Sequence, residues 1–289
     1  MAGAVVLGVA LIALAIGTFT DLRKREVPDL VNYSLIAIGL FFNLMMSIAL
    51  MEWSYIINSI AGFAAFFAFA LLMFYSGQWG GGDSKMIMGI GALIGLDITF
   101  KDIFLINFFV NMLIAGAFYG LLWSIALALM HWKKVLHEMK RYIKTRQIVF
   151  ARNLLLFSSL VFAAFIFLAK DMLLQLSLAI LIAVSIAAFC LWIFIKAVEK
   201  TAMLKYISPD KLTEGDWIAE EVKHKGKAIC SPKDLGISKK QIRQLINLYK
   251  ERKIRQVLIK EGIPFVPSFL AGFILTLVFG NILVLAGYF

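Results

Sequence analysis

The stretch from Met172 to Ile195, MLLQLSLAILIAVSIAAFCLWIFI, contains no charged side chain. A helix needs roughly 20 predominantly apolar residues to cross the hydrocarbon core of a bilayer, which is about 30 Å thick. The stretch is therefore long enough to span a membrane.

Other parts of the chain have the same character. Ala2–Thr20 and Tyr55–Trp79 are also free of charge, and a soluble protein would need several buried helices of this length without a polar face. The chain is 61% hydrophobic and only 16% charged, with a mean hydropathy of +0.86. A soluble domain is nearer half apolar and a quarter charged. The sequence therefore predicts a polytopic α-helical membrane protein embedded in the lipid bilayer.

About eight spans are expected. They cover residues 2–20, 30–50, 55–76, 84–99, 103–130, 153–169, 172–195 and 264–288. The turn at Lys170–Asp171 is short, so residues 153–195 form either two spans or a re-entrant hairpin, and the second choice leaves six spans.

Positive charge is distributed unequally between the two sides of these spans. With the N-terminus outside, 27 of the 29 Lys and Arg residues lie in inside segments, and only Lys101 and Lys170 lie outside. Cytoplasmic loops of membrane proteins carry such an excess. No positive residue precedes Arg23, so the first apolar stretch is expected to be a retained helix and not a cleaved signal. The net charge of +11 therefore reflects topology, and no nucleic-acid partner is expected.

The predicted domains follow from these spans. Residues 1–130 form a membrane core, 131–152 a basic cytoplasmic loop, 153–195 a hairpin, 196–262 a cytoplasmic α+β domain and 263–289 the last transmembrane helix. Within the α+β domain, strands are expected at Trp217–Val222, Ala228–Cys230 and Val257–Ile259. An amphipathic helix is expected over Ser238–Lys253, with Ser238 and Gln241 as a capping box. Its apolar positions are Ile242, Leu245, Ile246 and Tyr249.

Two aspartates lie at the ends of apolar stretches. Asp21 follows the first stretch and Asp83 precedes the fourth, so the topology places both at the cytoplasmic edge. Ionisable groups at this depth are costly and indicate function by default. Structural roles are the alternative, because Asp83 could cap the helix that it opens and Asp21 could neutralise Arg23 or Lys24. Three glycines, Gly80–Gly82, precede Asp83 and would allow another chain to approach closely.

These residues carry a family resemblance. Gly80-Gly81-Gly82-Asp83 matches the GxGD motif, and Asp21-Leu22 followed by Val27-Pro28 resembles the first aspartate motif of type IV prepilin peptidases. Gly262-Ile263-Pro264-Phe265-Val266-Pro267 resembles the proline-rich start of their last helix. The chain is most similar to the archaeal branch, the preflagellin and archaeal prepilin peptidases.

The resemblance implies an aspartic endopeptidase with Asp21 and Asp83 as catalytic residues. Gly80, Gly81, Gly82, Pro28, Lys85, Pro264 and Pro267 would support the site. Its partners would be membrane-anchored pilin-like or flagellin-like precursors, and cleavage would remove a short basic leader at the cytoplasmic face. No metal and no cofactor is expected. Bacterial members carry a cysteine-rich zinc module and a methyltransferase activity. The only cysteines here are Cys190 and Cys230, so no methylation is predicted.

Two other functions stay open at this point. A presenilin-like or signal-peptide-peptidase-like protease also uses GxGD, but its first aspartate follows a tyrosine inside a helix, whereas Thr20 precedes Asp21 here. A transporter also uses broken helices and intramembrane carboxylates, normally in two related halves. This chain has only one glycine break of that kind.

Overall fold

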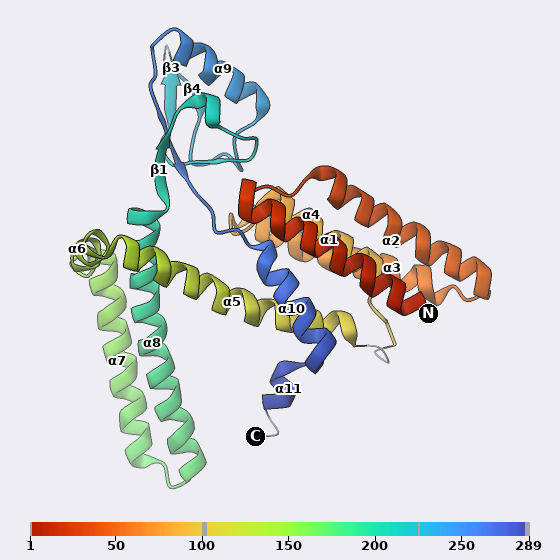
Figure 1. The fold of residues 1–289 in the computed structure, drawn as a ribbon. Helices are drawn as coiled ribbons and strands as arrows, with labels where there is room; N and C mark the ends of the chain where they lie inside the picture. The colour runs from red at the N-terminus through yellow and green to blue at the C-terminus, as the bar shows by residue number, and fades with distance from the viewer. Residues whose placement is uncertain (1, 100–102, 225, 287–289) are drawn as a thin grey trace. The chain divides into compact units, whose positions relative to one another are not determined.

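The structure is a computed structural model that describes residues 2–99, 103–224 and 226–286 (Figure 1). The predicted outward-facing Lys101 and the end of the predicted last span lie outside the described residues. The chain divides into two compact units. The first contains Met1–Leu122, Ile207–Val257 and Gly262–Phe289, and the second contains Trp123–Tyr206 and Leu258–Glu261.

The predicted fold class is confirmed. In the described part of the chain, six helices are long and apolar enough to cross a bilayer, as expected of a multi-pass membrane protein. They are α1 (Ala2–Lys24), α2 (Asp29–Leu50), α3 (Ser54–Tyr75), α5 (Phe104–Met130), α7 (Arg146–Leu168) and α8 (Met172–Ala202).

Two of the eight predicted spans are shorter helices. The helix α4 (Gly81–Ile94) and the helix α10 (Val266–Phe279) have 14 residues each, and the short α11 (Ile282–Ala286) follows α10. At 1.5 Å per residue, 14 residues reach only about 21 Å. The helix α4 ends at Ile94 and not at residue 99, because Gly95 leaves the helical conformation with a φ of 79°.

Glycines embed α4 between α2 and α3. A Cβ atom on Gly39 would lie 2.6 Å from the Leu93 nitrogen, and one on Gly62 would overlap the carbonyl oxygen of Gly91. Helices in membranes associate through such small residues because their backbones can then approach closely. The short helix α4 is therefore surrounded by its neighbours.

Polar side chains satisfy the last carbonyl groups of α4. The Nδ2 of the buried Asn43 donates to the carbonyl oxygens of Ala92 at 3.3 Å and Leu93 at 3.1 Å. The hydroxyl of Ser59 donates to the same oxygen of Ala92. The final carbonyls of a helix have no partner within it, so these bonds make an early end tolerable in apolar surroundings.

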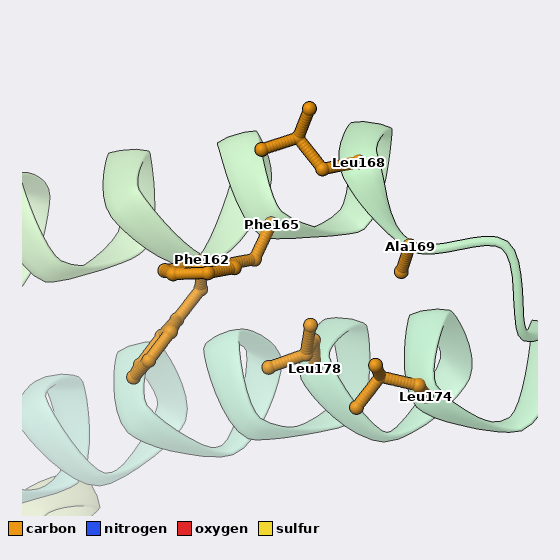
Figure 2. Close-up of a pocket in the computed structure, with 6 residues that line it drawn as sticks. All are labelled: Phe162, Phe165, Leu168, Ala169, Leu174 and Leu178. Carbon is orange, nitrogen blue, oxygen red and sulfur yellow. The ribbon is translucent and has the colours of Figure 1, made fainter.

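In the second unit, α7 and α8 form a hairpin (Figure 1). For this region the sequence allowed either two spans or a re-entrant hairpin. Both helices are long enough to span. The short turn is closed by Gln175, whose Nε2 donates to Ala169 O at 2.8 Å, and by Asp171, whose Oδ1 accepts from Leu173 N at 3.0 Å. Figure 2 shows the apolar side chains around a pocket of about 290 Å³ in this hairpin. They are Phe162, Phe165, Leu168, Ala169, Leu174 and Leu178.

The second unit also contains the basic helix α6 (Trp132–Tyr142), which packs against α8. The strand β1 (Leu204–Ile207) follows α8 and lies beside β5 (Val257–Lys260) in a sheet. The hydrogen bond from Glu261 N to Met203 O, 2.7 Å long, continues that association.

The remaining elements are small. They are the 3₁₀ turn η1 (Pro209–Lys211), β2 (Trp217–Ile218), β3 (Val222–His224), β4 (Lys227–Cys230) and α9 (Lys239–Lys250). The strands β3 and β4 are antiparallel, with Val222 opposite Cys230. The predicted capping box is confirmed, since Ser238 N donates to Gln241 Oε1 at 2.8 Å. The buried positions of α9 are Leu245 and Leu248, whereas Tyr249 is exposed, contrary to the prediction.

Candidate active site

Asp21 lies in the last turn of α1 and is buried, with 5% of its surface exposed. Its Oδ2 accepts a hydrogen bond from the backbone N–H of Val266 at 3.0 Å. Val266 is the first residue of α10, and the first N–H groups of a helix have no partner within that helix. An acidic side chain satisfies this donor and interacts favourably with the helix dipole. The start of α10 therefore fixes the position of Asp21.

Arg25 forms a second link between the same two segments. It ends α1 with a positive φ of 59°, and its guanidinium donates to the carbonyl oxygen of Gly262 at 2.6 Å. Of the predicted supporting prolines, Pro264 is buried between the two links. Pro267 lies in the first turn of α10, where a missing N–H costs little. The proline-rich segment is thus held against the end of α1.

Asp83 occupies the first turn of α4. Gly80 precedes the helix in an extended conformation, with φ −74° and ψ 167°, and its N–H donates to Asp83 Oδ2 at 3.2 Å. The predicted alternative role of Asp83 as the N-cap is wrong, because Gly80 holds that position and Asp83 is the third helical residue. The Asp83 side chain is partly buried.

The glycine loop contacts the segment that follows Asp21. A Cβ atom on Gly82 would lie 3.3 Å from both the nitrogen and the Cβ of Val27, whereas one on Gly81 would meet nothing within 4 Å. The Gly82 carbonyl also accepts a hydrogen bond from Asn32 Nδ2 at 3.3 Å. Gly82 is therefore the position at which the two aspartate-bearing segments come together.

The two predicted catalytic residues lie on helices that pack against each other, α1 and α4, and their carboxyl groups are close enough for electrostatic coupling. Both residues belong to the first unit, together with the proline-rich segment. The structure thus assembles in one place three motifs that are far apart in the sequence.

Lys85 joins the start of α4 to the start of α2, which Pro28 precedes. Lys85 Nζ lies 2.6 Å from Asp29 Oδ1 and 5.0 Å from the centroid of the Tyr33 ring. Pro28 precedes α2, and its carbonyl accepts from the N–H of Val31 at 3.0 Å. The ion pair is partly exposed, so we expect it to contribute little to stability and mainly to align the two helix starts.

Sequence reasoning missed two side chains at this site. Asn32 is fully buried, and its Oδ1 has no hydrogen-bond partner among the described residues. Trp79, which precedes the glycines, packs with its ring centroid 5.5 Å from that of Phe265 and 5.1 Å from that of Phe269. Asn32 could have been found in the sequence, because it is a polar residue within an otherwise apolar stretch. Trp79 could not, because its role depends on contacts with Phe265 and Phe269, far away in the sequence.

The part of the chain that contains both aspartates is similar to known proteins. The model of the type IV leader peptidase family matches residues 8–129, which include both aspartates and the glycine loop. The preflagellin peptidase of Methanococcus maripaludis is 42% identical over 83 residues, and that of Methanocaldococcus jannaschii is 43% identical over 86 residues. The preflagellin peptidase of Methanococcus voltae is 36% identical over 86 residues. No solved structure gives a significant match.

These matches cover part of each protein. They include 29–30% of this chain, and the chain spans 36% of the length of each of these relatives. The proline-rich segment lies beyond residues 8–129, so its place beside Asp21 is known from the structure alone. Residues 8–129, less than half of the chain, are thus similar to the type IV leader peptidase family.

Proposed function

We propose that this protein is a membrane aspartic endopeptidase whose catalytic residues are Asp21 and Asp83. It removes the short basic leader of flagellin-like or pilin-like precursors at the cytoplasmic face of the membrane. The observation that carries the proposal is the approach of these two carboxyl groups, which are supplied by two different helices. The names of the related preflagellin peptidases support the choice of substrate.

The chemistry follows from the pair. Two neighbouring carboxyl groups do not both ionise readily, so they share one proton and titrate together. The ionised member removes a proton from a water molecule, and the protonated member donates to the carbonyl oxygen of the scissile peptide. Water attacks that carbonyl carbon directly, and no covalent intermediate forms.

The surrounding residues orient the pair. The Val266 N–H donates to Oδ2 of Asp21, and the Gly80 N–H donates to Oδ2 of Asp83, so backbone donors orient both carboxyl groups. The glycine loop presents little side-chain bulk, which suits an extended substrate backbone beside Asp83.

The orientation of the protein is part of the proposal. Asp21 is in the last turn of α1 and Asp83 in the first turn of α4, so both acids lie at helix ends. The excess of positive charge on the same side supports a cytoplasmic active site with the N-terminus outside. The apolar helix of a precursor would remain in lipid while its leader entered the site.

The proposal is tested by reconstituting the full chain in vesicles with a leader-bearing preflagellin. We expect Asp21→Asn and Asp83→Asn each to reduce cleavage by at least about a hundredfold, because each removes one acid–base partner. The matched control is Asp171→Asn, which keeps a good helix N-cap and should cleave at the wild-type rate. Cleavage by either of the first two variants at a rate near that of the wild type would exclude the proposed pair.

A further inference from the structure

A basic pocket lies in the second unit, between α6 and the C-terminal end of α8. It has a volume of about 470 Å³ and is open to the surroundings. Its lining residues are Lys133, Lys134, His137, Glu138, Lys200 and Thr201.

The pocket is built on a buried carboxylate. Val135 and Glu138 form the buried face of α6, with 3% and 7% of their surfaces exposed. Glu138 Oε1 lies 2.8 Å from Lys200 Nζ, and its Oε2 lies 3.7 Å from the Arg141 guanidinium. Lys200 Nζ also lies 5.5 Å from the centroid of the Tyr142 ring. These contacts hold Lys200 in place at the pocket wall.

The other two lysines are not paired with a carboxylate, although Lys133 Nζ lies 5.8 Å from the centroid of the Trp132 ring. Within the described residues, neither Lys133 nor Lys134 lies within ion-pair distance of a carboxylate, and both are exposed. Three lysines against one glutamate leave these four side chains with an excess of two positive charges. The excess positive charge of the pocket therefore favours binding of an anion.

Its position relative to the apolar helices indicates the kind of anion. The helix α6 directly follows the last turn of α5, where Leu129 and Met130 are 71% and 75% exposed, and it precedes the apolar α7. Lys200 lies in the last turn of the apolar α8. Trp132 begins α6 and is exposed. Exposed tryptophans are common at the headgroup level of bilayers. A basic amphipathic helix between two spans lies in the plane of the interface.

We propose that this pocket binds the phosphate of one anionic lipid headgroup. The charge of the pocket and its place at the ends of apolar helices fit a phosphate that is attached to acyl chains. Lys133 and Lys134 contact the phosphate, and Lys200 completes the site from α8. The site would hold α6 against α8 and the membrane surface, independently of peptidase activity.

The test uses the purified full chain in mild detergent, with phosphatidylglycerol and phosphatidylcholine as probes. Native mass spectrometry counts the lipids that remain bound, and the melting temperature is measured with each lipid. We expect one tightly bound phosphatidylglycerol and a rise in the melting temperature that phosphatidylcholine does not produce. The Lys133→Gln/Lys134→Gln variant should bind phosphatidylglycerol at least about tenfold more weakly.

The matched control removes the same charge from nearby positions outside the pocket. Lys140→Gln/Lys144→Gln should bind like the wild type, and Lys133→Arg/Lys134→Arg, which keeps the charge, should retain binding. An equal loss in both Gln variants would show general attraction to a basic surface and would overturn the proposal. Inorganic phosphate that alone raises the melting temperature as much as the lipid would also overturn it, since the ligand would then be a free anion.

Discussion

At the residue scale, the site depends on how closely the segments of Asp21 and Asp83 approach. Gly82 contacts Val27, and a Cβ atom at 3.3 Å from two Val27 atoms would be tighter than ordinary van der Waals contact. The neighbouring Gly81 faces open space. The two glycines therefore offer a matched pair of positions that differ only in their surroundings.

We predict that Gly82→Ala lowers precursor cleavage at least about tenfold, and that Gly81→Ala, whose added methyl group meets no neighbouring atom of the protein, lowers it less. The added methyl group of Gly82→Ala pushes the loop from Val27, and small displacements of catalytic groups are costly in rate. Initial rates with a reconstituted preflagellin measure the effect. Equal rates in the two variants would mean that the close approach at Gly82 is unimportant for the site.

A second prediction concerns Asn32, which donates to the Gly82 carbonyl from a fully buried position. Asn32→Leu removes this bond and should lower the cleavage rate about tenfold per folded molecule, because Asp83 follows Gly82 directly. The control is Asn43→Leu on the same helix, whose bonds are to the other end of α4. It should reduce stability by about 1–3 kcal/mol while the folded fraction keeps its activity. A local role for Asn32 would be contradicted if Asn43→Leu, and not Asn32→Leu, lowered the cleavage rate per folded molecule.

Individual residues of the site were predictable to different degrees. Asp21, Asp83 and the glycines could be identified because charge beside hydrocarbon and consecutive glycines are unusual in a sequence. The Val266 N–H could not, because every residue except proline has one and only the fold selects which one meets a carboxylate. Asn32 lies between these cases, since its polarity was visible but its partner was not.

At the scale of elements, apolar length predicted the six long helices and overestimated α4. The conformation of Gly95, together with Asn43 and Ser59, ends that helix at Ile94, and these are tertiary effects. The helix α6 was expected only as a basic, helix-like loop. Its buried Glu138, paired with Lys200 of α8, could not be derived from the pattern of charges.

The ion pair between Glu138 and Lys200 predicts that the stability of the fold depends on pH. The hydrogen bond from Lys200 holds the pKa of Glu138 below its usual range. A carboxyl with a lowered folded-state pKa stabilises the fold above its unfolded pKa, about 4.3, and loses that contribution as the pH falls through the folded value. The wild type should therefore melt at a higher temperature than Glu138→Gln at pH 7, and the difference should shrink below about pH 4.

Melting followed by circular dichroism in detergent from pH 3 to pH 7 measures this difference. The control is Glu251→Gln, since Glu251 pairs with Lys253 at the surface and exposed pairs contribute little. A gap between wild type and Glu138→Gln that stayed constant over the whole range would contradict the ionic origin of the effect.

At the scale of the whole molecule, the sequence predicted a multi-pass membrane protein and an orientation. The first follows from long apolar helices that the structure contains. The second follows from the distribution of Lys and Arg along the chain. The long-range assembly of the site, with α1, α4 and α10 together, required the fold.

The orientation predicts which side of the membrane each loop occupies. In a variant without Cys190 and Cys230, we expect Lys170→Cys to react with a membrane-impermeant maleimide in intact cells. Lys144→Cys should react only after permeabilisation, because the basic loop is expected inside. Mass-shift labelling on gels distinguishes the two. The reverse pattern would place the two aspartates on the outer side.

The bond between the Val266 amide and Asp21 also bears on biosynthesis. Asp21 is translated 245 residues before Val266, so a nascent polypeptide contains both acids long before the amide that orients one of them. We expect completion of the proposed site to wait for insertion of the segment that contains α10. Until then, partly translated copies would be unable to cut neighbouring membrane proteins.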